Sequence, residues 1–257
     1  MSDPDAEITE DLFLNGQLRL RQPKRGHRAG HDAILLAAAT PARPGDRIAD
    51  FGAGVGAAGL AVARRVPGIE CVLLEIDSAL AELARANAAL NSLNAEVHTL
   101  DVAASASIFA AAGVAPDSVD AVLMNPPFND GSRHQSSPDA QRQVAHVARE
   151  DTLAQWIHAA RRILKPGGSL TLIWRAEGLA DILTKLHRGF GGIRILPVHP
   201  DPTKPAIRVL VSAIKGSGAP MSIRRGLNLS DENGIASAEA SAALDGQAIA
   251  FVEEGIR

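Results

Sequence analysis

Four consecutive residues carry the groups needed to hold a flat molecule that bears an amino group: Asn125, Pro126, Pro127 and Phe128. They follow residues 119–124, an apolar run that predicts a buried strand of an α/β sheet. Asn125 offers a side-chain amide oxygen and Pro126 a backbone carbonyl, and both groups accept hydrogen bonds. The two prolines fix the backbone and remove two donors, while Phe128 offers a ring face for stacking. A proline-rich turn with no ligand is the alternative interpretation.

The chemistry that this arrangement suits is a reaction at an exocyclic amine. Such a nitrogen is a poor nucleophile, because its lone pair is conjugated with the ring that carries it. Two acceptors that draw both N–H bonds out of the ring plane localise the lone pair on the nitrogen. We therefore expect Asn125, Pro126, Pro127 and Phe128 to be the catalytic residues.

A glycine-rich turn lies upstream of these residues. The strand expected before it contains Asp50, and the turn itself contains Gly52, Gly54 and Gly56. Glycines let a ligand approach the backbone closely, and the free N–H groups at the start of the following helix face that ligand. The spacing of Gly52, Gly54 and Ala57 also satisfies the dinucleotide-binding pattern. The turn therefore predicts a cofactor site and leaves the cofactor open.

Two further carboxylates come at the ends of expected strands. Glu75 closes the strand predicted at residues 71–74, where it would accept hydrogen bonds from a ribose diol. Asp101 follows the strand predicted at residues 96–100, next to Val102, where a carboxylate can accept from an adenine amino group. An acidic residue at a helix N-terminus is the alternative for Glu75, and a helix cap is the alternative for Asp101.

These motifs follow four consecutive strands at their carboxyl ends, which is the edge where open α/β sheets bind ligands. In order and content they resemble the class I S-adenosylmethionine-dependent methyltransferases, where an Asn-Pro-Pro-aromatic motif marks enzymes that methylate a planar nitrogen. The resemblance covers residues 11–216 and includes residues 164–168, a helix stop and turn before the strand expected at 169–174. A dehydrogenase that binds NAD would have no need of Asn125 and the prolines.

The resemblance implies a fold and a cofactor. The fold is α/β, with a Rossmann-like seven-stranded sheet, helices on both faces and a small N-terminal extension of a hairpin and a helix. The cofactor is S-adenosyl-L-methionine. The residues expected to bind it are Asp50, Gly52, Gly54, Gly56, Glu75, Asp101, Val102 and Asn125.

We expect three parts along the chain. Residues 1–42 form a basic segment with a hairpin and a helix, residues 43–218 the methyltransferase core, and residues 219–257 a tail that is helical or partly disordered. Asn15-Gly16 between alternating leucines predicts a type I′ turn in the hairpin, over residues 12–20. The elements expected late in the core are helices at 151–164 and 177–187 and an antiparallel pair of strands at 193–198 and 207–214.

Composition narrows the class of protein. The chain has 257 residues, 46% of them hydrophobic, which is enough to bury one full core. No apolar stretch is long enough to cross a bilayer, and the acidic start is unlike a signal peptide, so a cytoplasmic protein is expected. The single cysteine, Cys71, lies in an apolar strand, which excludes disulfides and cysteine metal sites.

Local charge suggests a nucleic-acid partner although the net charge is −3. A basic cluster at residues 19–28 follows the predicted hairpin. Residues 129–150 form a long polar connection that predicts a lid or a mobile loop. A solvated face without a partner is the alternative for the cluster. Glycines near His27 and His31 argue against a helical metal pair, so no metal is expected. The residues expected to contact RNA are Arg19, Arg21, Lys24, Arg25, Arg28, His31 and Arg133.

Two segments resemble the tRNA1(Val) adenine N6-methyltransferase family more narrowly. They are Gly30-His31-Asp32 before an apolar helix, and residues 204–210. The chain departs from that family's usual pattern at Phe51, Ala53, Val55 and His31. The implied reaction is transfer of a methyl group to adenine N6 in tRNA, at an adenine-37 type of position, after the base leaves its stack.

Other functions and states stay open. An N-methyltransferase of this superfamily could act on rRNA guanine N2, DNA adenine or the glutamine of a release factor. A module that binds S-adenosylmethionine or RNA without catalysis is the non-enzyme alternative. The oligomeric state is either a monomer or a homodimer.

Overall fold

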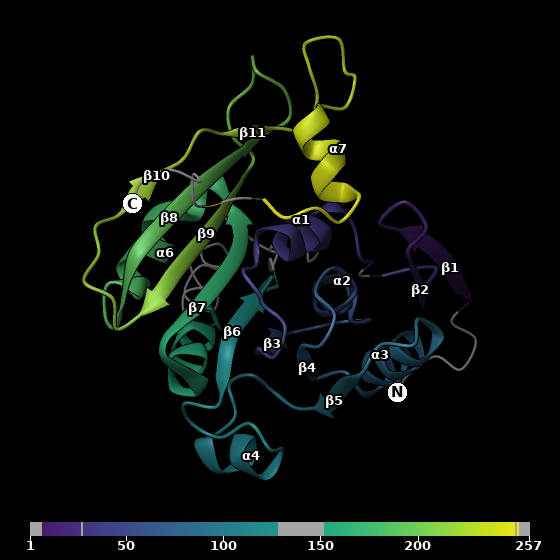
Figure 1. Cartoon of the computed structure of the whole chain (residues 1–257), viewed down its shortest axis with the longest axis vertical. Helices are drawn as coiled ribbons and strands as arrows, with labels where there is room; N and C mark the ends of the chain where they lie inside the picture. Colours follow the sequence, from purple (N-terminus) through teal and green to yellow (C-terminus); the bar gives the residue numbers. More distant parts are fainter. Residues whose placement is uncertain (1–6, 27, 128–151, 250, 252–257) are drawn as a thin grey trace, which may run out of the picture.

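The computed structural model describes residues 7–26, 28–127, 152–249 and 251. Its centre is a nine-stranded sheet with the order β10-β8-β9-β7-β6-β3-β4-β5, and β11 pairs with β8 beside β10 (Figure 1). The strands are β3 (Arg47–Phe51), β4 (Glu70–Glu75), β5 (Ala95–Thr99), β6 (Val119–Met124), β7 (Leu164–Arg175), β8 (Phe190–His199), β9 (Arg208–Lys215), β10 (Ser222–Ile223) and β11 (Leu227–Asn228).

Strands β3 to β7 are parallel, and β9 runs antiparallel to both β7 and β8. The prediction of seven strands that close with an antiparallel pair is thus confirmed, with β10 and β11 added to β8. These two additional strands have two residues each. They were not predicted, because so short a strand carries no alternation of apolar and polar residues.

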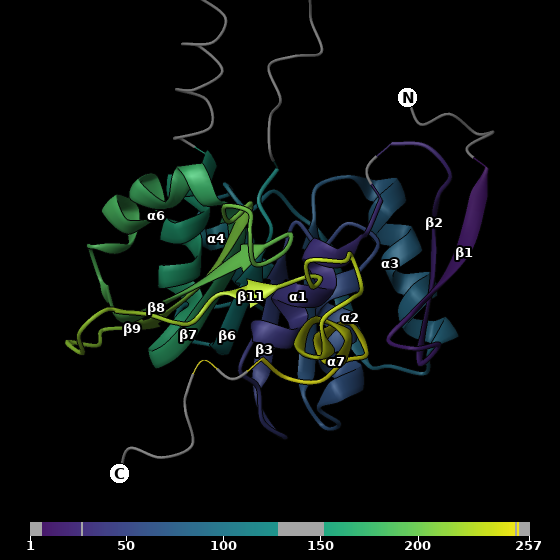
Figure 2. The same cartoon turned by 90° about the horizontal axis from the view of Figure 1, so that it is seen from above.

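Helices cover both faces of the sheet and enclose two hydrophobic cores (Figure 2). In β4, Leu73 faces one core, whereas Val72 and Leu74 face the other, so the strand reads as a continuous apolar run. The first core includes α1 (His31–Ala39), α2 (Ala57–Arg65), α3 (Ser78–Leu90) and α7 (Ala238–Leu244). The second includes α4 (Ala106–Ala111), the helical residues 152–163, and α6 (Leu179–Leu186) after a 3-10 turn, η1 (Ala176–Gly178).

The N-terminal hairpin forms a separate two-stranded sheet of β1 (Ile8–Phe13) and β2 (Leu18–Pro23). Asn15 and Gly16 have φ angles of 52° and 81°, and the N–H of Gln17 donates to the carbonyl of Leu14 over 3.1 Å. Positive φ at both central residues is the type I′ geometry, as predicted. The strands extend beyond the predicted residues 12–20.

Two asparagines of α3 fasten this hairpin to the core. The side-chain amide of Asn87 accepts from the backbone N–H of Arg21 over 2.7 Å and donates to its carbonyl over 2.9 Å. Asn91 makes the same pair of bonds with Arg19. The Nδ2 of Asn87 also donates to the carbonyl of Val55 over 3.0 Å, which connects the hairpin to the glycine turn.

Replacing Asn87 with alanine is expected to lower the free energy of unfolding by about 2–4 kcal/mol, because a buried N–H and two carbonyls lose their partner. Urea denaturation measures the change. Asn91→Ala is the matched control, and we expect a smaller loss because Asn91 is 8% exposed and Asn87 is fully buried. An equal or larger loss for Asn91→Ala would contradict this account.

The turn expected at residues 164–168 is instead part of a strand. Strand β7 begins at Leu164, which pairs with Val119, and its next paired residue, Ser169, pairs with Ala121. Between these two pairs, β7 has four residues and β6 has only one. Residues 165–168 therefore form a bulge, in which the chain leaves the sheet after Leu164 and returns to it at Ser169.

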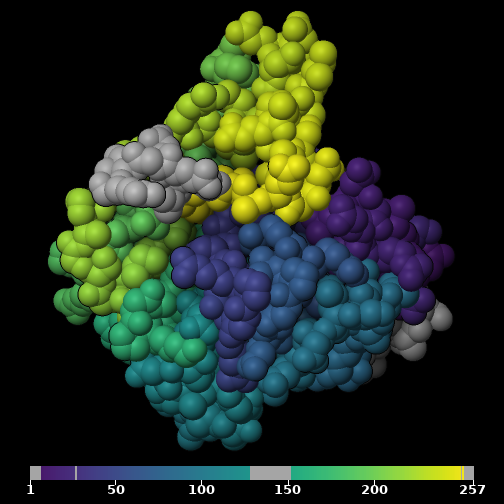
Figure 3. All heavy atoms as spheres, viewed as in Figure 1, coloured from purple at the N-terminus to yellow at the C-terminus, as the bar shows by residue number. Residues whose placement is uncertain are grey.

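The C-terminal tail packs on the N-terminal part of the chain. The backbone N–H of Ile249 donates to the carbonyl of Ala38 on α1 over 2.8 Å, and Gly246 lies beside Leu14 of the hairpin turn. Figure 3 shows these yellow residues against the purple and blue ones. The helix expected in the tail is α7. In the described part of the chain, no helix has the length and apolar character to span a membrane.

Candidate active site

A narrow cleft lies at the carboxyl edge of the sheet, where β3 and β6 end side by side. Its floor is the glycine turn after β3, and Asn125, directly after β6, lines it as well. Helix α1, the first turn of α2 and Leu80 of α3 supply further walls. The structure thus brings Asp50, Gly52, Gly54 and Asn125 together in one cleft. The other lining residues are Ala29, Ala33, Leu36, Ala53, Val55, Ala57, Ala58 and Leu80.

Gly52 has no room for a side chain. Its φ is +64°, and a Cβ built on it would lie 2.4 Å from Cη2 of Trp156. The Trp156 ring is also in edge contact with Phe51, at 6.3 Å between ring centroids. The helical residues 152–163 therefore support the glycine turn from below.

Asp50 is buried behind this turn, at 3% exposure. Its Oδ2 accepts from the backbone N–H of Gly59 on α2 over 2.8 Å. Burial raises the pKa of Asp50 to about 7, against the lowering effect of the Gly59 hydrogen bond, and the charge of Glu75 raises it further. Asp50 therefore titrates close to neutral pH.

This pKa predicts a pH-dependent stability. The folded pKa lies above the ordinary 3.8, so between about pH 4 and 7 the folded protein binds more protons and loses stability as the pH rises. Asp50→Asn removes this titration. As the pH rises from 5 to 8, the wild type should therefore lose about 2 kcal/mol more of its free energy of unfolding than the variant does. Urea denaturation of both proteins across this range measures the difference. Parallel curves would contradict the assignment.

Glu75 holds the glycine turn from the next strand. Its Oε2 accepts from the N–H of Gly54 over 2.7 Å, and its Oε1 accepts from the N–H of Asp77 over 2.9 Å. It is 6% exposed and lies behind the cleft lining. Gly56 is the N-cap of α2, with a φ of 87°, and lies outside the lining as well.

Asp101 and Val102 are placed differently from Asn125 and the glycines. Asp101 is exposed, and its Oδ1 accepts from the N–H of Ala103 over 2.8 Å, which closes a local turn. Val102 is buried in the core that contains α4. Neither residue lines the cleft.

The side-chain oxygen of Asn125 receives no hydrogen bond from the described residues. This oxygen, Oδ1, is buried. Buried polar atoms are nearly always paired, so such an oxygen points to a ligand that supplies an N–H or O–H. Pro126 is buried and Pro127 exposed, whereas Phe128 lies outside the described residues.

Most of the basic residues expected to contact RNA are paired within the hairpin. Arg19 and Arg21 both form ion pairs with Glu10, at 3.5 and 3.3 Å. Lys24 pairs with Glu7, and Arg28 pairs with Asp11 at 2.7 Å. No ion pair of Arg25 is found among the described residues. His31 is the first residue of α1, and Arg133 lies outside the described residues, as does His27.

The sequence did not reveal the residues that support the site although they lie far from its motifs in the chain. Trp156 and Asn87 are the main examples, since their contacts join helices to the glycine turn. The sequence did indicate the hairpin ion pairs, because a type I′ turn at Asn15-Gly16 places Glu10 opposite Arg21. In the described residues, no group of three His, Cys, Asp or Glu side chains could hold a metal ion.

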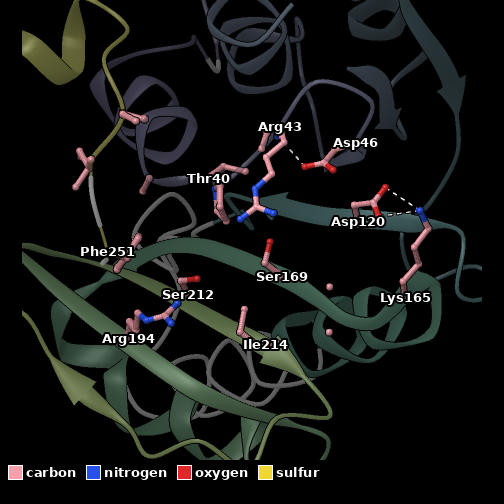
Figure 4. A pocket seen from close by; sticks show the side chains of 18 of the residues that line it. Thr40, Arg43, Asp46, Asp120, Lys165, Ser169, Arg194, Ser212, Ile214 and Phe251 are labelled. Atoms are coloured by element: carbon pink, nitrogen blue, oxygen red, sulfur yellow. Dashed lines mark hydrogen bonds and ion pairs between the residues drawn. The ribbon is translucent and has the colours of Figure 1, made fainter. Parts of the chain in front are cut away.

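A second cavity, of about 610 Å³, lies at the opposite edge of the sheet. It is lined by residues near the amino ends of β6 and β7, among them Asp120 and Lys165, which form an ion pair. Figure 4 shows Arg43 and Arg194 reaching toward it from opposite sides. This cavity is remote from Asn125, because β6 runs from one edge to the other.

Two features of the cleft fit S-adenosylmethionine. Gly52 and Gly54 line the cleft with backbone alone, which lets a ligand approach closely, and Glu75 behind the lining fixes the conformation of this turn. The unpaired Oδ1 of Asn125 lies beside this turn and can accept from the group that receives the methyl. The described residues therefore fit the cofactor.

Comparison with known proteins agrees with this arrangement. The methyltransferase small domain family matches residues 31–197 of the chain. The tRNA1(Val) (adenine(37)-N6)-methyltransferase of Porphyromonas gingivalis is 32% identical over 179 residues, which cover 67% of this chain and 68% of that protein. Ribosomal RNA small subunit methyltransferase C of Stutzerimonas stutzeri is 36% identical over 107 residues, 40% of this chain and 30% of that protein.

Solved structures show the same fold. A predicted O-methyltransferase from Agrobacterium tumefaciens has a TM-score of 0.71 and 33% identity, covering 84% of this chain and 97% of that one. The 16S rRNA N2 G1207 methyltransferase of Thermus thermophilus, solved with AdoMet and guanosine, has a TM-score of 0.55 and 20% identity, over 81% of this chain and 50% of that one. The chain belongs to the methyltransferase small domain family, and it is a methyltransferase that uses S-adenosyl-L-methionine as its cofactor.

Proposed function

We propose that this enzyme transfers a methyl group to the exocyclic N6 of adenine in a tRNA. The observation that carries the proposal is the buried and unpaired Oδ1 of Asn125, at the end of β6 and in the same cleft as the glycine turn. An exocyclic amine has N–H groups that can donate a hydrogen bond to this oxygen.

The residues of the chain act by position and by hydrogen bonding. S-adenosylmethionine, when bound, supplies a methyl group on a positively charged sulfur. The Oδ1 of Asn125 and the carbonyl of Pro126 accept hydrogen bonds from the two N–H groups of the amine. These bonds direct the nitrogen lone pair at the methyl group. The amine loses a proton after it attacks, so no covalent enzyme intermediate is needed. Holding the two reactants in line supplies most of the rate enhancement.

The choice of tRNA adenine rests on the relatives. The Porphyromonas gingivalis enzyme is named for adenine 37 of tRNA1(Val), and the match covers about two thirds of both chains. A flipped base is less costly in an anticodon loop, where stacking is already incomplete. We also propose a cytoplasmic location, which a tRNA substrate supports.

Guanine N2 in ribosomal RNA is the second candidate. It is favoured by the similarity to ribosomal RNA small subunit methyltransferase C, although that match covers only 30% of the relative. Guanine N2 is an exocyclic amine with two N–H bonds, so Asn125 would serve it in the same way.

Incubation of the purified enzyme with labelled S-adenosylmethionine and four acceptors separates these candidates. The acceptors are unmodified tRNA, 16S rRNA, DNA and a release factor, each in a separate reaction. We expect label in tRNA at a rate at least about tenfold above the other acceptors, a difference of about 1.4 kcal/mol in activation free energy. Label mainly in 16S rRNA would favour the second candidate, and label only in the release factor would overturn both.

A further inference from the structure

A basic groove lies between the helical residues 152–163 and residues 183–188, which are the C-terminal half of α6 and the turn that follows it. Its volume is about 850 Å³. Nine of the described residues line it, of which five are basic and none is acidic. The basic residues are His158, Arg161, Lys185, His187 and Arg188.

The cations of this groove differ from those of the hairpin. Within the described part of the chain, no ion pair involves Lys185 or Arg188, whereas Arg19 and Arg21 are both paired with Glu10. Arg161 connects the two walls, because its Nη1 donates to the backbone carbonyl of Arg188 over 3.1 Å. The groove therefore carries positive charge that no acidic side chain of the described residues neutralises through an ion pair.

The groove lies along a helix that reaches from the active-site edge to the amino edge of the sheet. The helical residues 152–163 start at the carboxyl edge of the sheet and end where β7 begins, at the amino edge. One face of this helix presents Trp156 to Gly52 in the glycine turn. The other face presents Ala154, His158 and Arg161 to the groove. The groove thus lies on the side of the molecule, with Ala154 nearer the edge that holds Asn125, and with Arg188, just before β8, at the amino edge.

Its position is also opposite to the hairpin. Figures 1 and 2 show α6 at one end of the molecule and the β1–β2 hairpin at the other. A strand of RNA that delivers a base to Asn125 can continue over one of these ends. Phosphates are attracted to unneutralised cations, and basic residues that are already paired contribute less.

We infer that the groove between residues 152–163 and α6 binds the phosphate backbone of the RNA substrate. The inference rests on the proposed function, since it assumes an RNA whose base reaches Asn125. Lys185 and Arg188 on one wall and His158 on the other meet successive phosphates. These contacts fix the register of the RNA and carry no base specificity.

The test uses the full chain, an unmodified tRNA transcript and charge-neutralised variants. The groove variant is Lys185→Gln/Arg188→Gln. The matched control is Arg85→Gln/Lys165→Gln, which removes two cations that are paired with Glu82 and Asp120. Equilibrium binding of labelled tRNA is measured from 50 to about 300 mM salt, together with the Kd for S-adenosylmethionine.

We expect the groove variant to bind tRNA roughly tenfold more weakly, and the slope of log affinity against log salt to fall by about 1–2, since each lost phosphate contact removes nearly one unit. The control should change neither quantity appreciably. Methyl transfer to a short oligonucleotide, which reaches Asn125 without spanning the groove, should keep its KM in both variants. A structural defect would raise that KM or weaken cofactor binding.

The binding readout separates the two proposals. Groove-dependent tRNA binding without adenine methylation would keep this inference and overturn the proposed function. Unchanged affinity and salt slope in the groove variant would overturn the inference, whatever the enzyme methylates. The inference also fails if Arg19→Gln/Arg21→Gln lowers the slope and the groove variant does not, or if the groove variant weakens binding of a release factor and not of RNA.

Discussion

Asn125→Ala is expected to lower kcat by at least about 100-fold, the usual effect of removing one hydrogen bond that acts at the reacting centre. The alanine takes away the buried Oδ1 and leaves the amine of the substrate conjugated with its ring. The glycine turn and Glu75 are unaffected, so the Kd for S-adenosylmethionine should change by less than about threefold, below 0.7 kcal/mol. Single-turnover methyl transfer and calorimetric titration with the cofactor measure the two effects.

A conservative variant separates chemistry from packing at this position. Asn125→Asp keeps an oxygen acceptor of the same shape and should retain more activity than Asn125→Ala. Activity of the alanine variant within about tenfold of the wild type would show that the unpaired oxygen is not used in the reaction.

Gly52→Ala is expected to produce the largest loss of stability among single-methyl additions at the site. The new Cβ would lie 2.4 Å from Cη2 of Trp156, and the φ of +64° is unfavourable for alanine. Overpacking and the left-handed conformation together should cost about 2–5 kcal/mol of unfolding free energy. Urea denaturation without cofactor gives the value directly.

Gly54 provides the control for this prediction. Its φ is +57°, and a Cβ built on it meets no atom of the described residues within 4 Å. Gly54→Ala should therefore lose only the conformational part, about 1–2 kcal/mol. Adding Trp156→Leu to Gly52→Ala should recover part of the overpacking loss in a double-mutant cycle. Equal losses for the two glycine variants would contradict the close contact with Trp156.

The positions of the strands and of Asn125 could be predicted from the sequence for a simple reason. Each motif follows an apolar run, and the carboxyl ends of parallel strands meet at one edge. Asp50, Gly52, Gly54 and Asn125 line the same cleft for this reason. The predicted core position of Cys71 is likewise confirmed by its burial.

Contacts between distant segments could not be predicted in this way. The amide of Asn87 pairs with Arg21 of the hairpin and with Val55 of the glycine turn, which requires knowing how α3 packs. The basic groove combines Arg161 of the helical residues 152–163 with Arg188 of the turn after α6, and the two share no motif in the sequence. Conversely, the hairpin cluster looked like a phosphate site because its acidic partners lie earlier in the chain, across the turn.

Identification of the methylated nucleoside tests the central claim most directly. RNA that has been modified with deuterium-labelled S-adenosylmethionine is digested to nucleosides, and the labelled product is identified by mass spectrometry. The account predicts N6-methyladenosine, absent when Asn125→Ala replaces the wild type. Label on a ribose oxygen, or on a carbon of the base, would contradict it, because neither acceptor uses the unpaired oxygen of Asn125.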